Sequence, residues 1–222
     1  FKDKRYITVS GKKLFLVYKP CDMPDTHLFI DTWRKLAARS GIGDFYFVCM
    51  GKSSVDHRSL GFDGLMIDVF PQIRAGLLDT FWEKASIKKF GKNYPRQIWK
   101  MTGVPVLMDY KKITDKLLDL YQGIGKDVYP SIMPNWDNTP RCGREGEIFK
   151  GANPVEFKRQ LIGVIDQLMT RPREERLVFI KSWIVWAEGY YLEPDSRSGK
   201  KYLEAVKSAV FPPCRGRSSG SC

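Results

Sequence analysis

The feature that most constrains the fold of this chain is a repeated alternation of short β-rich runs with segments of helical periodicity. Runs of strand character lie at 13–18, 44–50, 61–70, 105–110, 127–134 and 176–183, and helical spacing of apolar residues recurs between and after them. Strands that alternate with helices are typical of a parallel sheet covered by helices. The predicted fold class is therefore α/β, with helices outside a parallel sheet.

The segment 153–169 carries the clearest helix signals. Asn153 suits the N-cap, Pro154 the first helical position and Glu156 the third residue after the cap, which is the pattern of a capping box. Apolar residues then recur at helical spacing and form one face. We therefore predict a helix over 153–169, and amphipathic helices over 25–41 and 199–210 as well.

Length and composition favour one soluble domain of ordinary size. The chain has 222 residues, of which 43% are hydrophobic and 28% charged. We expect the domain to cover residues 1–211, with 70–104 as an irregular basic excursion and 212–222 as a disordered basic tail. No apolar run approaches the ~20 residues that a membrane-spanning helix needs, so we expect no transmembrane segment.

The formal charge of +12 raises the question of an anionic partner. No helix carries a basic stripe interleaved with aromatic residues, so we expect no nucleic-acid partner. The five separated cysteines and the two histidines lack metal-ligand spacing, and no phosphate-binding motif is present, so we expect no metal and no cofactor. The cysteine pattern favours a reducing compartment, and we expect a cytoplasmic location. Because the chain begins at Phe1 without Met, an upstream signal peptide stays an open alternative.

Motifs rich in polar and aromatic residues follow three of the predicted strands. They are YKPCDMPD at the end of 13–18, MPNWDNTPRCGREG at the end of 127–134 and WAEGYYLEPD after 176–183. Binding and catalytic residues of parallel α/β folds gather at the carboxyl ends of the strands. The coincidence predicts a functional site at this edge of the sheet.

The loop at 135–141 holds an aromatic ring, an acid, an amide and a guanidinium, namely Trp136, Asp137, Asn138 and Arg141. Such a set suits a sugar ring and an anionic substituent. The alternative is an ordered turn in which the acid and the amide bond their own backbone. At the end of the first strand, Tyr18 and Asp22 are further candidates for substrate binding.

These motifs resemble one known family. The stretches NWDNTPRCGREGEIFKG (135–151), FIKSWIVWAEGYYLEPD (179–195), DKRYITVSGKKLFLVYKPCDMPD (3–25) and GFDG (61–64) are similar to the WbsX-type glycosyltransferases of polysaccharide biosynthesis. That family looks like a branch of the endo-α-mannosidase-like enzymes of glycoside hydrolase family 99. The similarity takes in nearly the whole chain except the tail.

The resemblance implies a (β/α)8 barrel of the TIM type, beginning in this chain just before the fourth strand. An incomplete barrel of about five units cannot close, and its open edge would expose backbone groups. We therefore expect a truncated or split gene product whose open edge is covered by the missing N-terminal strands or by a partner chain. A self-contained smaller α/β domain is the alternative.

The resemblance also assigns roles at the last strand. The family motif there reads Asn-Ala-Trp-Asn-Glu-Trp-Ala-Glu-Gly, and its two glutamates are the catalytic pair of the hydrolase relatives. One deprotonates the sugar 2-hydroxyl, and the other acts as general acid and then as base. By that comparison Glu188 is the acid–base residue and Val185 replaces the other glutamate. Glu193 is a second candidate catalytic carboxylate, and Trp186 a candidate for substrate binding.

Three functions compete at this stage. The first is glycosyl transfer in the biosynthesis of a polysaccharide of O-antigen or lipopolysaccharide type, with an oligosaccharide or polysaccharide substrate and a sugar nucleotide donor. The second is hydrolysis of α-linked glycans. The third is carbohydrate binding by a catalytically disabled fragment, because glycosidic cleavage needs two functional groups and valine at 185 supplies none.

Overall fold

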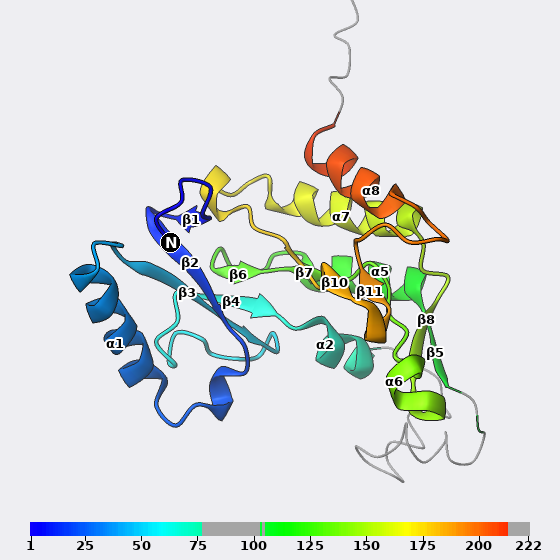
Figure 1. Cartoon of the computed structure of the whole chain (residues 1–222), viewed down its shortest axis with the longest axis horizontal. Helices are drawn as coiled ribbons and strands as arrows, with labels where there is room; N and C mark the ends of the chain where they lie inside the picture. Colours follow the sequence, from blue (N-terminus) through cyan, green and yellow to red (C-terminus); the bar gives the residue numbers. More distant parts are fainter. Residues whose placement is uncertain (77–102, 104, 213–222) are drawn as a thin grey trace, which may run out of the picture. The chain divides into compact units, whose positions relative to one another are not determined.

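The computed structural model describes residues 1–76, 103 and 105–212, and these residues form two compact units that are described separately (Figure 1). The first unit comprises residues 1–76, Lys116–Ile132 and Val164–Ile180. The second comprises residues 103, 105–115, Met133–Gly163 and 181–212. Most of the predicted excursion at 70–104, and all but the first residue of the predicted disordered tail at 212–222, lie outside the described residues. The prediction of one domain over 1–211 stays a prediction.

A five-stranded sheet forms the frame of the first unit, in the order β1-β2-β3-β4-β6. Its strands are β1 (Thr8–Val9), β2 (Lys12–Val17), β3 (Phe45–Gly51), β4 (Gly64–Ile67) and β6 (Val128–Tyr129). The short β1 pairs antiparallel with β2, and every later pair is parallel. Strands that are neighbours in this sheet are also consecutive along the chain, except that β5 (Val106–Asp109) lies between β4 and β6 in sequence and pairs elsewhere. The predicted parallel sheet is thus confirmed.

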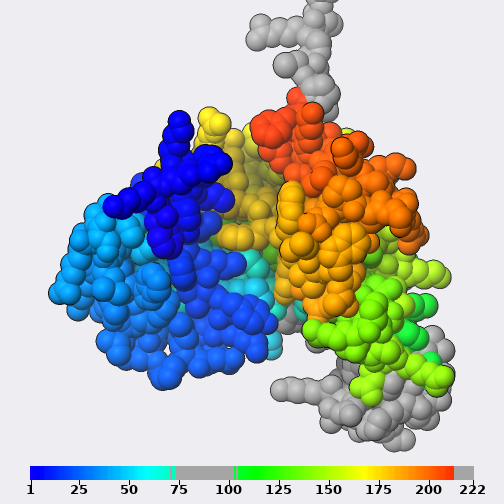
Figure 2. Space-filling view, viewed as in Figure 1, coloured from blue at the N-terminus to red at the C-terminus, as the bar shows by residue number. Residues whose placement is uncertain are grey.

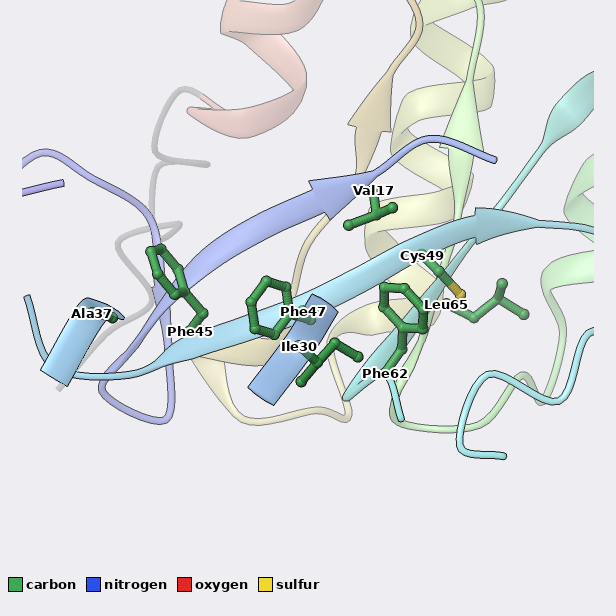
Figure 3. Packing of buried hydrophobic residues seen from close by; sticks show 8 residues of the cluster. All are labelled: Val17, Ile30, Ala37, Phe45, Phe47, Cys49, Phe62 and Leu65. Carbon is green, nitrogen blue, oxygen red and sulfur yellow. The ribbon is translucent and has the colours of Figure 1, made fainter. Parts of the chain in front are cut away.

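Helix α1 (Thr26–Arg39) covers one face of this sheet, beside β3 in Figure 1. It begins where predicted, because the Asp25 carboxylate accepts a hydrogen bond of 2.8 Å from the backbone N–H of Leu28. Phe45, Phe47 and Cys49 alternate along β3 toward the helix, as side chains on one face of a strand must. Figure 3 shows them packed with Ile30 and Ala37 of α1, and this cluster is the core on the helix side of the sheet.

The other face of the sheet carries the intervening side chains of the same strands. Val48, Met66 and Tyr129 are buried there, with Phe179 packed against them. Phe179 belongs to β9 (Phe179–Ile180), which pairs parallel with β7 (Ser131–Ile132). The strand predicted over 127–134 is therefore split into β6 and β7 on either side of Pro130, which has no N–H to donate to a sheet.

Two other predicted strands are shorter than expected. The predicted strand at 61–70 contains β4 only over Gly64–Ile67, because Val69 starts helix α2 (Val69–Gly76). The predicted strand at 176–183 contains only Phe179–Ile180, preceded by the 3-10 turn η4 (Arg173–Glu175). A further 3-10 turn, η1 (Pro20–Asp22), follows β2 directly.

The second unit is built on the parallel pair β5 (Val106–Asp109) and β8 (Glu147–Lys150). Three helices accompany it: α5 (Tyr110–Tyr121), α7 (Pro154–Leu168) and α8 (Lys201–Val210). Both α5 and α7 contribute residues to each unit. Short turns α6 (Thr139–Cys142) and η3 (Gly143–Glu145) connect β7 to β8.

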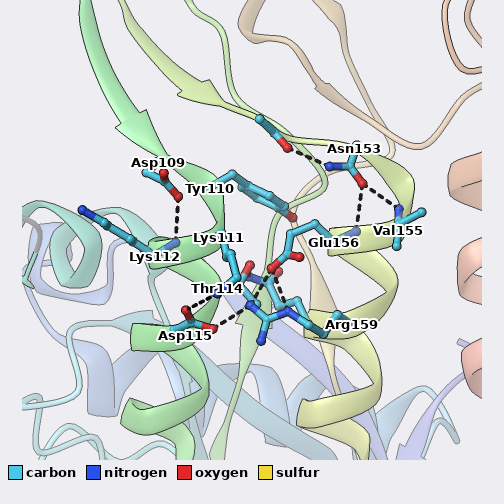
Figure 4. A network of polar contacts seen from close by, with 12 residues as sticks. Asp109, Tyr110, Lys111, Lys112, Thr114, Asp115, Asn153, Val155, Glu156 and Arg159 are labelled. Carbon is cyan, nitrogen blue, oxygen red and sulfur yellow. Dashed lines mark hydrogen bonds and ion pairs between the residues drawn. The ribbon is translucent and has the colours of Figure 1, made fainter.

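Polar contacts join α5 to α7 within the second unit (Figure 4). Asn153 caps α7 as predicted, since its Oδ1 accepts hydrogen bonds of 3.0 Å from the N–H groups of Val155 and Glu156. The Glu156 carboxylate accepts hydrogen bonds from Arg159, which also binds Asp115 of α5 at 2.7 Å. The predicted helices at 153–169 and 199–210 are therefore confirmed, to within a residue or two at each end.

No helix in the described part of the chain is long and apolar enough to cross a membrane.

Candidate functional site at the hairpin 184–191

The predicted catalytic segment folds into a small antiparallel hairpin. Its strands are β10 (Ile184–Val185) and β11 (Tyr190–Tyr191), and the 3-10 turn η5 (Trp186–Glu188) joins them. Gly189 closes the turn with a φ of 66°, in the left-handed region that glycine adopts at little cost. The hairpin was not foreseen, because its strands are too short to show a periodicity.

The hairpin presents different side chains on its two faces. Val185 lies opposite Tyr190 and Ile184 lies opposite Tyr191 in the register of the pair. Residues directly opposite each other in an antiparallel pair share a face. One face therefore carries Val185 and Tyr190, and we call it the inner face. The outer face carries Ile184 and Tyr191.

Glu188 forms an ion pair with Arg141, a contact that the sequence did not reveal. Nη1 of Arg141 lies 2.5 Å from Oε1 of Glu188. The side chain of Arg141 is 64% exposed and that of Glu188 is 12% exposed. The pKa of Arg141 lies above its ordinary value, through the Cys142 side chain first and through the charge of Glu188 second. Two separately predicted residues are thus brought together, one from α6 and one from the hairpin turn.

The backbone of the loop at 135–141 holds the hairpin turn in place. The Asp137 N–H donates to the carbonyl of Glu188 at 3.0 Å. The Asp137 carboxylate accepts from the N–H of Thr139 at 3.0 Å and from its hydroxyl at 2.6 Å. The buried Asn138 accepts from the N–H of Glu147 at 2.6 Å. Asp137 and Asn138 thus make the backbone bonds of an ordered turn, and their roles in substrate binding stay predictions.

Trp136, predicted as a sugar platform, is only 5% exposed. Its ring packs against Tyr190 of the inner face, with ring centroids 4.9 Å apart. A buried ring has no free face for a ligand, so in this structure Trp136 supports the inner face of the hairpin. Its binding role stays a prediction.

The exposed aromatic surface of the hairpin lies elsewhere, on Trp186 and Tyr191. Their rings are stacked with centroids 3.9 Å apart and planes 18° apart, and Trp186 is 47% exposed. Nε1 of Trp186 donates a hydrogen bond of 2.8 Å to Oε2 of Glu193. The hairpin lies in the golden-orange part of the second unit, uncovered on the face that Figure 2 shows. Tyr191 was not singled out from the sequence, although its neighbours were.

Tyr18 and Asp22 belong to the first unit, at the carboxyl end of β2. Tyr18 is 64% exposed, and Asp22 lies 3.7 Å from the ammonium group of Lys19. Their predicted place at a strand end is confirmed, whereas their part in substrate binding stays a prediction. Among the described residues no cluster of His, Cys, Asp or Glu side chains has the geometry to hold a metal ion.

Comparison with known proteins identifies relatives. The family model of glycosyltransferase WbsX matches residues 1–206. The uncharacterized protein WxcX of Xanthomonas campestris pv. campestris (strain ATCC 33913) is 28% identical over 213 residues, covering 94% of this chain. WxcX of strain B100 is also 28% identical, over 211 residues. The chain spans 28% of the length of each of these curated relatives.

Solved structures show the likeness in fold. A glycoside hydrolase-like protein matches with a TM-score of 0.55 at 14% identity, covering 93% of this chain and 56% of that chain. The GH99 endo-alpha-mannosidase from Bacteriodes thetaiotaomicron covers 91% of this chain and 57% of its own, at 14% identity and a TM-score of 0.41, which is too low to support an inference. The α/β fold is confirmed, and the number of barrel units stays a prediction.

The family model extends over more than nine-tenths of the sequence and includes both motifs that build the hairpin site. The chain therefore belongs to the glycosyltransferase WbsX family.

Proposed function

We propose that this chain is part of a carbohydrate-active protein that transfers glycosyl groups in polysaccharide biosynthesis, of the O-antigen or lipopolysaccharide type, with its site at the hairpin turn. The observation that carries the proposal is the contact of 2.5 Å between Arg141 and Glu188. Membership of the glycosyltransferase family supports the class of reaction. The match to only part of the WxcX proteins makes the activity of the whole protein a proposal too.

The geometry suits a polar sugar substrate. Arg141 is 64% exposed, so part of its guanidinium is open to solvent and can donate to a hydroxyl or to the phosphate of a sugar nucleotide. Glu188 is the more buried partner, and its carboxylate is fixed by the ion pair. A group held in one orientation before the substrate arrives costs little ordering on binding. In this arrangement Arg141 positions the sugar nucleotide donor, and the Glu188 carboxylate accepts a hydrogen bond from the hydroxyl group of the acceptor.

A second candidate, binding without catalysis, is favoured by Val185. This residue pairs with Tyr190 on the inner face of the hairpin, where the resemblance expects a catalytic glutamate. Valine neither takes a proton nor stabilises positive charge at the sugar. Hydrolysis of α-linked glycans by the family mechanism needs two glutamates, and this chain lacks one of them. Glu193, proposed as a substitute catalytic group, is bound to Trp186.

Donor dependence distinguishes these functions. The full-length protein is incubated with a panel of sugar nucleotides and oligosaccharide acceptors, and in parallel with α-linked oligosaccharides in water alone. We expect product only with the donor. Release of sugar without a donor would favour the hydrolase, and binding without turnover would favour the disabled binder.

The role of Glu188 is tested by Glu188→Gln, which keeps the size of the side chain and removes the charge. We expect transfer to fall by about 10²-fold or more. The matched control is Glu204→Gln on the exposed side of α8. An equal loss of transfer activity in both variants would show that the loss does not arise at the hairpin site. The cytoplasmic location and the absence of a nucleic-acid partner stay predictions.

A further inference from the structure

The outer face of the hairpin carries a ring stack that the contact between Arg141 and Glu188 does not use. Trp186 lies flat on Tyr191, with planes 18° apart, and 47% of Trp186 is exposed. Ile184, on the same face as Tyr191, is 59% exposed. An aromatic ring is normally buried more than this, since a large apolar side chain gains free energy when it leaves water. Two stacked and partly exposed rings offer a flat apolar surface on which a ligand can stack.

Two contacts orient the Trp186 ring. Tyr191 supports one face of the Trp186 ring, and Glu193 fixes the indole edge through the hydrogen bond of 2.8 Å from Nε1. Tyr191 is itself partly withdrawn from water, and this burial raises the pKa of its hydroxyl, as does the charge of Asp195. A ring that is already fixed in orientation loses little conformational entropy when a ligand covers it.

The groups around the stack favour a neutral ligand that donates hydrogen bonds. Glu193 accepts the indole N–H with Oε2, and within the described residues its Oε1 has no hydrogen-bond partner. An ionised carboxylate only accepts hydrogen bonds, so it pairs with hydroxyl groups and repels phosphates and carboxylates. Sugar rings combine hydroxyl donors at the edge with apolar C–H groups on the face. A nucleobase offers a flat face as well, but its nucleotide brings phosphates toward the carboxylates of Glu193 and Asp195, although the charge of Arg197 also reaches Tyr191.

We propose that Trp186, supported by Tyr191, is a stacking platform for one neutral pyranose ring of the glycan, and that Glu193 accepts hydrogen bonds from the hydroxyl groups of that ring. The proposal rests on the proposed function, because it names a binding position for the same carbohydrate substrate. It assigns Glu193 to binding instead of to catalysis. It also moves the platform role from the buried Trp136 to the exposed Trp186.

The test measures binding of neutral oligosaccharides to the full-length protein by calorimetry and by tryptophan fluorescence. The panel contains gluco-, manno- and galacto-configured oligosaccharides, matched uronic-acid oligosaccharides and nucleoside monophosphates. We expect a neutral oligosaccharide to bind the wild type and Trp186→Ala to weaken its binding by about tenfold or more, as truncation of an aromatic anchor does. Trp186→Phe, which keeps a ring, should retain part of the affinity.

The matched control is Trp183→Ala. Trp183 precedes the same hairpin and is 57% exposed, but the stack consists of Trp186 and Tyr191. Glu193→Gln should weaken neutral-sugar binding and lessen the discrimination against uronic acids. A near-ultraviolet circular dichroism spectrum and a urea melt of each variant show whether the fold is kept.

The outcomes separate the two proposals. Neutral-sugar binding that is lost in Trp186→Ala and kept in Trp183→Ala supports the platform. Sugar binding that Trp186→Ala leaves unchanged overturns the platform but not the proposed function. Binding of a nucleoside monophosphate that Trp186→Ala weakens more than it weakens the binding of any neutral sugar overturns the platform. Failure of the wild type to bind any glycan overturns both proposals. Self-association in ultracentrifugation that Trp186→Ala abolishes, in a wild type that binds no sugar, also overturns both.

Discussion

Gly189 lies so close to Asp137 that a Cβ added to the glycine would come within 2.8 Å of the Asp137 backbone nitrogen and 3.0 Å of its backbone oxygen. This approach lets Asp137 donate its N–H to the carbonyl of Glu188 at 3.0 Å. The hairpin turn that presents Glu188 and the loop that presents Arg141 are therefore coupled through a backbone contact that only glycine permits. The position of the ion pair depends on it.

Gly189→Ala should destabilise the protein and separate the hairpin turn from the loop. The left-handed φ of 66° costs a non-glycine residue about 1–2 kcal/mol, and the contact with Asp137 adds about 1–3 kcal/mol of overpacking. Urea unfolding measures the sum. The control is Gly199→Ala, where φ is 56° but no atom lies within 4 Å, so only the backbone term applies. Equal losses in both variants would show that the close approach to Asp137 does not matter.

Arg171 of the first unit should contribute strongly to stability. It is only 9% exposed and donates to the carbonyl oxygens of one turn, those of Ile124, Gly125, Lys126 and Val128. Arg171→Met keeps much of the volume and removes the side-chain donor of these carbonyls, although that of Gly125 still accepts from the N–H of Val128. We expect a loss of about 2–4 kcal/mol in the free energy of unfolding. The same substitution at the exposed Arg39, in the last turn of α1, is the control and should cost less than about 0.5 kcal/mol. A loss below about 1 kcal/mol for Arg171→Met would contradict this role.

Asp127 should make stability depend on pH in the acid range. Burial alone raises the pKa of its carboxyl, but hydrogen bonds from Arg58 and His57 outweigh burial and hold the pKa below its ordinary value. A carboxyl with a depressed folded pKa adds stability above its unfolded pKa of about 3.9, and that stability is lost as the pH falls through the folded pKa.

The test compares thermal melts of the wild type and of Asp127→Asn between pH 7 and pH 2.5. We expect the advantage of the wild type to be largest above about pH 5 and to shrink below about pH 4. Asp166→Asn, at an exposed position of α7, serves as the matched control for replacing an aspartate by asparagine. A constant advantage of the wild type over the whole range would contradict the linkage.

The order of the elements could be predicted from the sequence, whereas the local shape of the site could not. A helix such as α7 can be recognised from its N-cap residue, Asn153, and from an apolar repeat that extends over many residues. The strands of the hairpin each contain two residues, too few for alternation to be read. The burial of Trp136 and the exposure of Trp186 depend on which face of the hairpin each ring packs against. Likewise, the contact between Arg141 and Glu188 joins residues 47 positions apart (188 − 141), and no local pattern specifies it.

Val185→Glu tests whether the hairpin retains a disabled catalytic site. Val185 lies opposite Tyr190 on the inner face and is partly buried, so a carboxylate there should cost about 1–3 kcal/mol of stability unless it gains a partner. If the resemblance assigns this position correctly, the new carboxylate supplies the missing group, and hydrolysis of an α-linked oligosaccharide should rise by about 10²–10⁴-fold. The comparison is made in the full-length protein on a panel of α-linked oligosaccharides. Val185→Gln is the matched control, because glutamine has the same shape as glutamate but cannot act as an acid or a base at neutral pH. Hydrolysis in Val185→Glu alone would establish a catalytic position that valine occupies. Equal turnover in the wild type and both variants would show that residue 185 takes no part in the chemistry, and that the role assigned to this end of the hairpin is wrong.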